Sequence, residues 1–188
     1  MGAFYMITLS SLKDLPKIKK PIALTIGIFD GVHRGHQHLL QELKKRGTSV
    51  VLTFSTHPSE ILQPHHPCPM ICTLAERLNL LEQYGTDLTL LLPFTSDLAK
   101  TPYDHFIKHL HETLPFDYLI LGEKAVLGKN GEGDEMAIKN LAKKLNFEAL
   151  YLPKFILEGE VVSSRKIRQL LENNHITQAA RLLGRDLI

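Results

Sequence analysis

Three histidines and three glycines stand close together in the stretch GIFDGVHRGHQHLL, residues 27–40. His33 and His36 are three residues apart, so both side chains can reach the same ligand from one turn of a helix. A turn that leads into a helix is a natural anion site, because unpaired backbone N–H groups and the helix dipole favour negative charge there. Gly27 and Gly31 permit a close backbone approach or a positive φ. The stretch therefore predicts a phosphate-binding turn in which the two histidines donate hydrogen bonds to developing negative charge.

Two other interpretations of this stretch stay open. One is a polar turn that carries its histidines by accident. The other is a structural zinc site, but zinc needs three or four ligands, and His33, His36 and His38 cannot all converge from one helical turn. The spacing matches neither the dinucleotide-binding G-x-G-x-x-G loop nor the Walker A loop. We expect no metal ligands in the chain, since further zinc ligands would have to come from distant residues: His57, His65, His66, Cys68 or Cys72.

The elements around the turn alternate along the chain. Apolar runs predict strands at 22–29, 48–54, 87–94, 116–122 and 147–155. Helical spacing of apolar residues predicts helices at 34–47, 73–85, 102–114 and 134–146, and two short ones within 163–185. The proline-rich segment 55–70 predicts a loop, whose length favours a functional role. This order predicts a Rossmann-like, doubly wound α/β fold with a parallel sheet of about five strands.

Such a fold binds its ligands beyond the carboxyl ends of the strands. The first strand is expected to end near Phe29, and the turn then holds Asp30 and Gly31. The helix is expected to begin between Arg34 and His36. The phosphate-binding turn therefore lies at the ligand-binding edge of the predicted sheet.

The composition limits the class of protein. A chain of 188 residues with 44% hydrophobic content is one domain's worth of sequence with enough apolar residues for a core, so we expect a single domain over 1–188. The formal net charge is only +2, from twenty-two Lys and Arg and twenty Asp and Glu. This near balance argues against a dedicated nucleic-acid binder, which would carry a strong positive charge. Two cysteines, with no signal peptide and no membrane span, favour a cytoplasmic protein without membrane contact. The oligomeric state is left open.

The stretch GIFDGVHRGH resembles the G-x-F-D-G-x-H-x-G-H signature of the bacterial FAD synthetases, members of the HxGH nucleotidyltransferase superfamily. VVSSRKIRQLL resembles the family's I-S-S-T-x-I-R motif, and the similarity covers nearly the whole chain. The resemblance implies transfer of AMP from ATP to FMN, which gives FAD and pyrophosphate, with Mg²⁺ accompanying the triphosphate. The common bacterial enzyme carries a riboflavin kinase domain after the LLGR segment, and this chain stops at Ile188, where that domain would begin. We therefore expect no riboflavin kinase domain in it, either because the protein is naturally a lone adenylyltransferase or because the chain was cut there.

The resemblance also implies roles for particular residues. His33, His36 and Arg168 would be catalytic, with Arg168 on the β and γ phosphates of ATP. Ser163 and Ser164 would cap the final helix pair and donate hydroxyls to the same phosphates. Further ATP-binding positions would be Gly27, Phe29, Asp30 and Gly35. The flavin-binding positions would be Phe54, His57 and Pro58, although a strand phenylalanine such as Phe54 is more often a core residue.

The chain departs from the family pattern at three places. Arg165 stands where the family has Ser or Thr, residues 124–128 replace its D-F-R-F-G run, and Phe54–Pro58 replace its F-D-P-H-P segment. These changes fall on the nucleotide and flavin sides more than on the phosphate motif. They keep two alternatives open: a nucleotidyltransferase of the same fold that acts on another phosphorylated acceptor, and a non-catalytic protein that binds a nucleotide or flavin.

Overall fold

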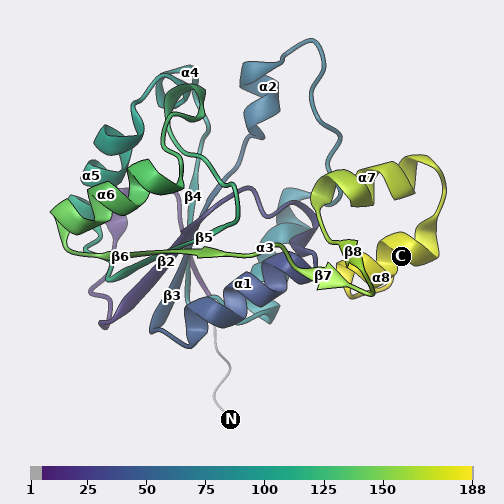
Figure 1. The fold of residues 1–188 in the computed structure, drawn as a ribbon, viewed down its shortest axis with the longest axis horizontal. Helices are drawn as coiled ribbons and strands as arrows, with labels where there is room; N and C mark the ends of the chain where they lie inside the picture. Colours follow the sequence, from purple (N-terminus) through teal and green to yellow (C-terminus); the bar gives the residue numbers. More distant parts are fainter. Residues whose placement is uncertain (1–5, 188) are drawn as a thin grey trace.

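The computed structural model describes residues 6–187 and has a six-stranded parallel sheet between two layers of helices (Figure 1). The strand order is β1-β4-β3-β2-β5-β6, and every neighbouring pair is parallel. This confirms the doubly wound α/β class. The strands are β1 (Ile7–Leu9), β2 (Ile22–Ile26), β3 (Thr48–Phe54), β4 (Leu88–Leu92), β5 (Tyr118–Gly122) and β6 (Glu148–Leu152).

The sheet has one strand more than the sequence predicted. Strand β1 is three residues long, is mostly exposed and joins the sheet only at its edge, where Ile7 pairs with Leu88. A strand this short carries no apolar run that a sequence pattern would detect. A further two-stranded hairpin, β7 (Ile156–Leu157) with β8 (Glu160–Val161), was also missed.

Eight α-helices complete the described part of the chain. The six predicted helices are all confirmed, and the predicted loop 55–70 contains a short helix, α2, that was not expected. Its start is fixed by a capping box between His57 and Glu60, and Pro58 occupies its first turn. Helix α4 was missed as well. The bounds are α1 (Arg34–Lys44), α2 (Pro58–Leu62), α3 (Leu74–Gln83), α4 (Ser96–Ala99), α5 (Tyr103–Thr113), α6 (Glu135–Leu145), α7 (Ser164–Glu172) and α8 (Ile176–Leu183).

The two faces of the sheet bury separate cores. Alternate residues of β2 point to opposite faces, so Ala23 packs with α1 and α3 while Leu24 packs with α5 and α6. All five residues of β2 are buried, as expected for a central parallel strand. Helices α7 and α8 form a third, smaller core around Ile167 and Leu182 beside the start of α1.

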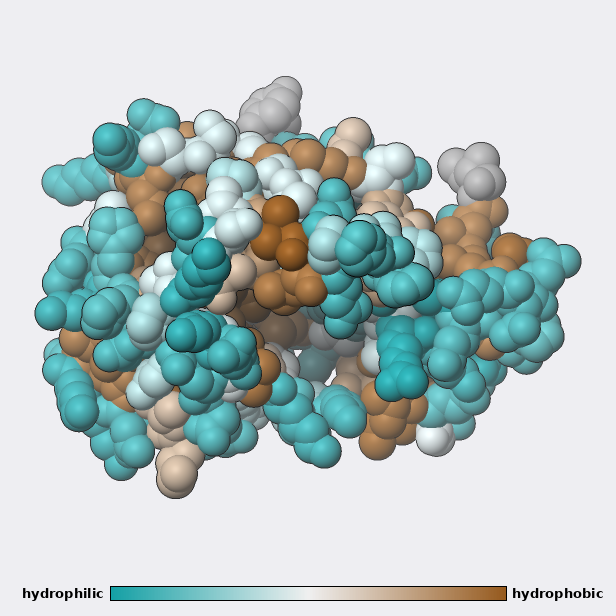
Figure 2. Space-filling model, turned by 90° about the horizontal axis from the view of Figure 1, so that it is seen from above, coloured by the Kyte–Doolittle hydropathy of each residue, from teal (hydrophilic) through white to brown (hydrophobic). Residues whose placement is uncertain are grey.

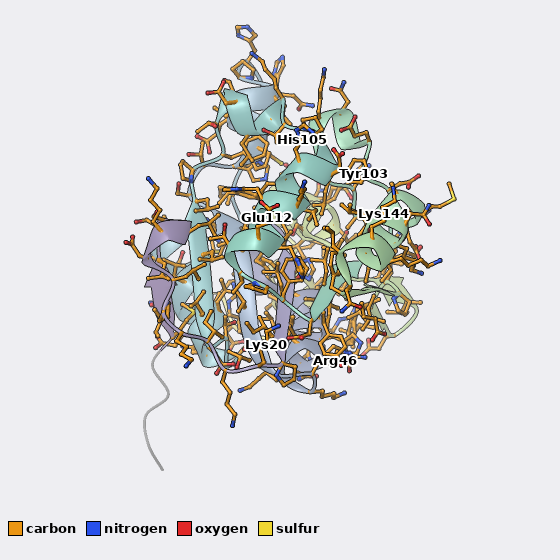
Figure 3. The ribbon with its side chains drawn as sticks, turned by 90° about the vertical axis from the view of Figure 1, so that its left-hand side faces the viewer. Lys20, Arg46, Tyr103, His105, Glu112 and Lys144 are labelled. Atoms are coloured by element: carbon orange, nitrogen blue, oxygen red, sulfur yellow. The ribbon has the colours of Figure 1, made fainter. Side chains whose placement is uncertain are left out.

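Strand β2 pairs with both β3 and β5, and the chain winds outward from it in both directions. This is the point where the strand order reverses, and ligand sites in such folds lie there, beyond the carboxyl ends. The lysine-rich segments 17–20 and 44–46 lie at the other end of the strands, where Figure 3 labels Lys20 and Arg46. Within residues 6–187, no helix is both long and apolar enough to cross a lipid bilayer.

Candidate active site

The turn after β2 has an unusual backbone. Strand β2 ends at Ile26, three residues earlier than the sequence predicted, and the chain then passes through positive φ at Phe29 (56°), Gly31 (77°) and Val32 (38°). A positive φ is a genuine outlier for a β-branched residue such as Val32. Phe29 and Val32 are 3% and 0% exposed, so burial holds the turn in this strained form.

The two histidines stack at the start of α1, which begins at Arg34 as expected. Their ring centroids are 3.6 Å apart and the rings are nearly parallel. His33 is the N-cap residue, and its Nδ1 atom accepts a hydrogen bond from the backbone N–H of His36 at 3.3 Å. In the neutral ring this leaves the proton on Nε2 of His33, which can donate to a ligand.

Burial keeps both rings neutral at pH 7. Desolvation lowers the pKa of His33 to about 4. Desolvation and the neighbouring His33 ring lower the pKa of His36 well below its usual value. Within the described chain, the buried Nδ1 atom of His36 has no hydrogen-bond partner. The histidines therefore meet a ligand as neutral hydrogen-bonding groups and not as cations.

Neutral, buried His33 makes the folded protein sensitive to acid. Its folded pKa lies below the unfolded value of 6.5, so the unfolded chain binds more protons and stability falls as the pH drops from 6.5 toward 4. Between pH 7.5 and pH 5 we expect this group to cost about 2 kcal/mol of unfolding free energy. His33→Asn keeps a capping side chain without a titrating ring. In urea titrations at pH 7.5 and pH 5, the variant should therefore lose about 2 kcal/mol less unfolding free energy than the wild type. If the wild type and the variant lose the same unfolding free energy between the two pH values, the lowered pKa assigned to His33 is wrong.

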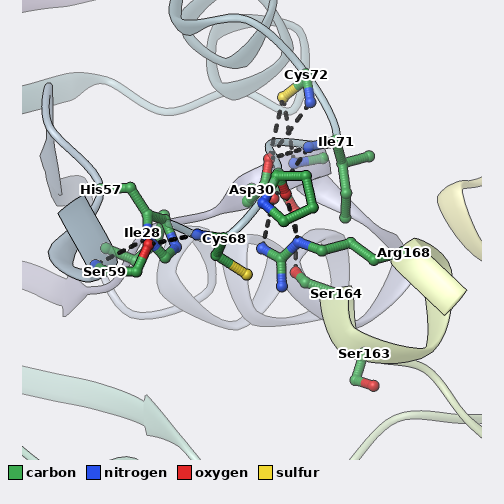
Figure 4. Close-up of polar contacts among 12 residues, drawn as sticks. Ile28, Asp30, His57, Ser59, Cys68, Ile71, Cys72, Ser163, Ser164 and Arg168 are labelled. Carbon is green, nitrogen blue, oxygen red and sulfur yellow. Dashed lines mark hydrogen bonds and ion pairs between the residues drawn. The ribbon is translucent and has the colours of Figure 1, made fainter. Parts of the chain in front are cut away.

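Asp30 is the centre of a buried network (Figure 4). Its carboxylate is 2% exposed and accepts hydrogen bonds from the backbone N–H of Ile71 at 3.0 Å and of Cys72 at 3.3 Å. The Nη2 atom of Arg168 donates to it at 2.7 Å, and the Nε atom of Arg168 donates to the carbonyl of Pro69 at 2.7 Å. Asp30 and Arg168 together join the turn, the segment 69–72 and helix α7.

The two serines contact the same region in different ways. Ser163 is the N-cap of α7 and accepts from the backbone N–H of Lys166, as the capping prediction required. The hydroxyl of Ser164 donates to the carbonyl of Asp30 at 3.1 Å. The third member of the predicted motif, Arg165, is exposed. Helix α7 is thus held against the turn, with its N-terminus beside Asp30.

Three residues for which the sequence predicted no role at the turn also hold it. Arg185 donates to the carbonyl of Gly31 at 2.7 Å, and Gln37 donates to the carbonyls of Val32 and Leu183. The thiol of Cys72 accepts from the N–H of Gly31 at 3.2 Å. Each is a polar residue in an ordinary helix or loop, and only its spatial partner reveals the role.

Gly27 and Gly35 both lie where the backbone comes close to an aromatic ring. A Cβ atom at Gly35 would stand 3.2 Å from the His33 ring, and one at Gly27 would stand 3.1 Å from the Phe29 ring. Both contacts are tighter than ordinary packing, so a side chain at either position would push a ring of the site.

A cavity of about 510 Å³ lies next to the turn. Small-molecule sites usually have volumes of roughly 300 to 1,000 Å³ and mostly apolar walls. Figure 2 looks onto this end of the molecule and shows apolar side chains gathered in a hollow that hydrophilic ones surround. The wall comes from the ends of β2 and β3, from α2 and α4, and from residues 125–131: Ile26, Gly27, Ile28, Phe54, Pro58, Leu62, Phe94, Leu98, Ala99, Thr101, Phe106, Ala125, Val126, Leu127, Gly128, Asn130 and Gly131.

The cavity brings together two of the three predicted flavin residues. Phe54 and Pro58 line it, and Phe54 meets the ring of Phe94 edge to face at 5.3 Å. Phe54 is also 7% exposed and belongs to the core, so both interpretations of this residue describe it. His57 is not a lining residue of the cavity, because its ring turns back to cap α2 and contacts Ser59. Ala125, Val126 and Leu127, which depart from the family pattern, form one wall together with Gly128.

Among residues 6–187, no group of three or more His, Cys, Asp or Glu side chains is arranged to hold a metal ion. Asp30 is the carboxylate of the turn itself, and Arg168 with two backbone amides already occupies its oxygens.

Comparison with known proteins agrees with the geometry. A family model described as FAD synthetase matches residues 15–166. The bifunctional riboflavin kinase/FMN adenylyltransferase of Buchnera aphidicola subsp. Schizaphis graminum is 28% identical over 187 residues, which are 96% of this chain. The chain spans 60% of the length of that relative.

Two more relatives extend the comparison. The FAD synthetase of Listeria monocytogenes is 29% identical over 95% of this chain and 73% of its own length. A crystal structure of a Streptococcus pneumoniae protein, named a macrolide-efflux protein, superposes with a TM-score of 0.84 at 27% identity, over 97% of this chain and 62% of that chain. Because the family model covers residues 15–166, from just after η1 (Leu12–Asp14) to the start of α7, this chain belongs to the FAD synthetase family.

Proposed function

We propose that this protein transfers AMP from ATP to FMN and releases FAD and pyrophosphate. One observation carries the proposal: the apolar cavity and the phosphate-binding turn share a wall at Gly27 and Ile28. A flavin ring suits an apolar, phenylalanine-bearing cavity of this size. With the ring there, the phosphate at the end of the FMN side chain would point toward the start of α1.

The reaction needs alignment more than covalent catalysis. An oxygen of the FMN phosphate attacks the α-phosphorus of ATP, the bond to the bridging oxygen breaks, and pyrophosphate leaves. The N-terminus of α1 and the Nε2–H group of His33 would stabilise charge on the α-phosphate, with His36 beside it. Both histidines are neutral, so they act as hydrogen-bonding groups aimed at that charge.

Arg168 is proposed to reach the β and γ phosphates from α7. Its Nε and Nη2 atoms already hold Pro69 and Asp30, and its side chain is 16% exposed. The phosphate contact would therefore use the remaining Nη1 atom. Ser163 and Ser164 would join it at the N-terminus of α7, while Gly27, Phe29, Asp30 and Gly35 shape the nucleotide side. Magnesium would come with ATP as part of the substrate.

The proposal also names the binding partners and the cellular compartment of this chain. ATP, FMN and FAD would be the partners of this chain, with no nucleic acid among them. The free thiols of Cys68 and Cys72 suit a reducing cytoplasm.

The direct test is incubation with ATP, Mg²⁺ and FMN, followed by chromatography of the flavins. We expect FAD and pyrophosphate in equal amounts. Riboflavin is the matched control, because it lacks the phosphate that attacks ATP and should give no FAD. If FMN gives no FAD while another phosphorylated acceptor releases pyrophosphate, the protein is a nucleotidyltransferase with a different substrate. If no acceptor releases pyrophosphate, it binds without turnover.

A further inference from the structure

Arg77 is a buried cation at the junction of the two proposed substrate sites. It belongs to α3, is 2% exposed and is among the largest fully buried side chains. Its Nη1 atom donates to the carbonyl of Ile28 at 2.8 Å, and its Nη2 atom donates to the carbonyl of Phe54 at 2.7 Å. No carboxylate of the described residues lies within ion-pair distance of it.

The two carbonyls lie where neighbouring strands leave the sheet. Strand β2 ends at Ile26, so Ile28 is beyond the ladder, and Phe54 is the last residue of β3. Carbonyls in such places lack a strand partner and cost free energy when they are buried without one. Arg77 satisfies both with a single rigid guanidinium and thereby fixes the distance between them. Thr53 gives Ile28 a second donor at 3.1 Å.

Stability alone is a weak reason for an arginine here. Burial disfavours the charged form and lowers the pKa of Arg77, and its Nε atom is buried without a hydrogen-bond partner among the described residues. A buried charge without a close counter-charge is costly, and apolar replacements of such groups are often tolerated. What a planar fork supplies in addition is fixed geometry between two acceptors.

The geometry that Arg77 fixes belongs to the acceptor site. Ile28 and Phe54 both line the 510 Å³ cavity, and Ile28 leads directly into the strained turn at Phe29 and Asp30. We propose that Arg77 is a positioning residue: it holds the ends of β2 and β3 at a fixed separation, so that the flavin cavity and the phosphate-binding turn are aligned before substrate arrives. This inference rests on the proposed function for its kinetic readout.

The kinetic test compares Arg77→Met, which keeps a long side chain without donors, with Arg77→Lys, which keeps the charge without the fork. We expect Arg77→Met to raise the KM for FMN about tenfold and the KM for ATP much less, because misplaced cavity walls weaken acceptor alignment. Arg77→Lys should recover part of the loss. Arg46→Met is the matched control, since Arg46 pairs with Glu42 at the far end of the sheet. A lower active fraction with unchanged KM values would mean a structural role only and overturn the proposal.

A second measurement needs no substrate. Hydrogen–deuterium exchange of Arg77→Met should accelerate in peptides that cover 27–31 and 53–57, whose amides of Gly27, Gly31 and Ser55 are hydrogen-bonded in the intact protein. The strands of the core should exchange as before. If the wild type makes no FAD, this exchange pattern still decides the role of Arg77, and unchanged exchange in both peptides overturns it. If the wild type makes FAD and both readouts are unchanged, the proposed function stands and the proposal for Arg77 fails.

Discussion

His36→Ala lowers kcat by roughly 10² to 10³, the effect of removing one preorganised hydrogen-bonding group from a developing charge. The ring of His36 stacks on the ring of His33, and its centroid lies 4.9 Å from that of the Phe29 ring, so its loss also frees the His33 ring from its stacking partner. The pyrophosphate release assay measures kcat at saturating ATP and FMN. Because the effect falls on the transition state, the KM values should change little.

The control for this variant is His38→Ala, which removes a histidine of the same helix that contacts Phe155 instead of the stacked pair. It should retain turnover close to that of the wild type. Circular dichroism and thermal unfolding of His36→Ala establish that the fold is intact. Wild-type turnover in a folded His36→Ala protein would remove this residue from the phosphate site.

Arg168→Lys should lower kcat/KM for ATP by roughly 10²-fold, although the charge is kept. The guanidinium binds Asp30 and the carbonyl of Pro69 through two different nitrogen atoms, and an ammonium has no fork to reproduce that spacing. The turn, the segment 69–72 and α7 would then lose their shared anchor, and a shift of about 1 Å at a reacting centre costs a factor of this order. Initial rates at varied ATP with saturating FMN measure the effect.

Arg165→Lys is the matched control, because Arg165 lies on the same helix and is exposed. Its kinetics should be those of the parent protein. If Arg165→Lys is the impaired variant and Arg168→Lys is normal, the two arginines have been assigned the wrong way round. Equal ATP kinetics in all three proteins would show that neither contacts the triphosphate.

The sequence by itself determined the fold class and the local start of each main helix. The apolar runs of β2 to β6 and the helical spacing between them are local signals, and they sufficed for the doubly wound sheet. Helix starts are also local, because a cap needs only its own first turn: Ser163 caps α7 as predicted, and Thr73 with Glu76 forms a capping box at the start of α3. The place of GIFDGVHRGH at the strand-to-helix turn followed from the same patterns.

Weak local signals explain what the sequence missed in the fold. Strand β1 exists because the edge of β4 offers backbone partners, and no pattern in three residues reveals that edge. Helix α2 has only five residues and lies in a segment whose prolines predict a loop. Its capping box also uses His57, an uncommon N-cap residue. For β1 the backbone partners offered by β4 outweighed the average secondary-structure preference of its residues. For α2 the local hydrogen bonds of the capping box did so.

Only the tertiary structure decided the chemistry of the candidate site. Spacing indicated that His33 and His36 could reach the same ligand, but burial by distant segments set their neutral state, because desolvation depends on everything packed around a group. The pairing of Arg168 with Asp30 joins residues 138 positions apart. Arg77 donates to two backbone carbonyls, and because every residue has such a carbonyl, the sequence does not indicate which ones it binds. Local order is encoded in neighbours along the chain, whereas charge state and cavity shape arise from groups that only folding brings together.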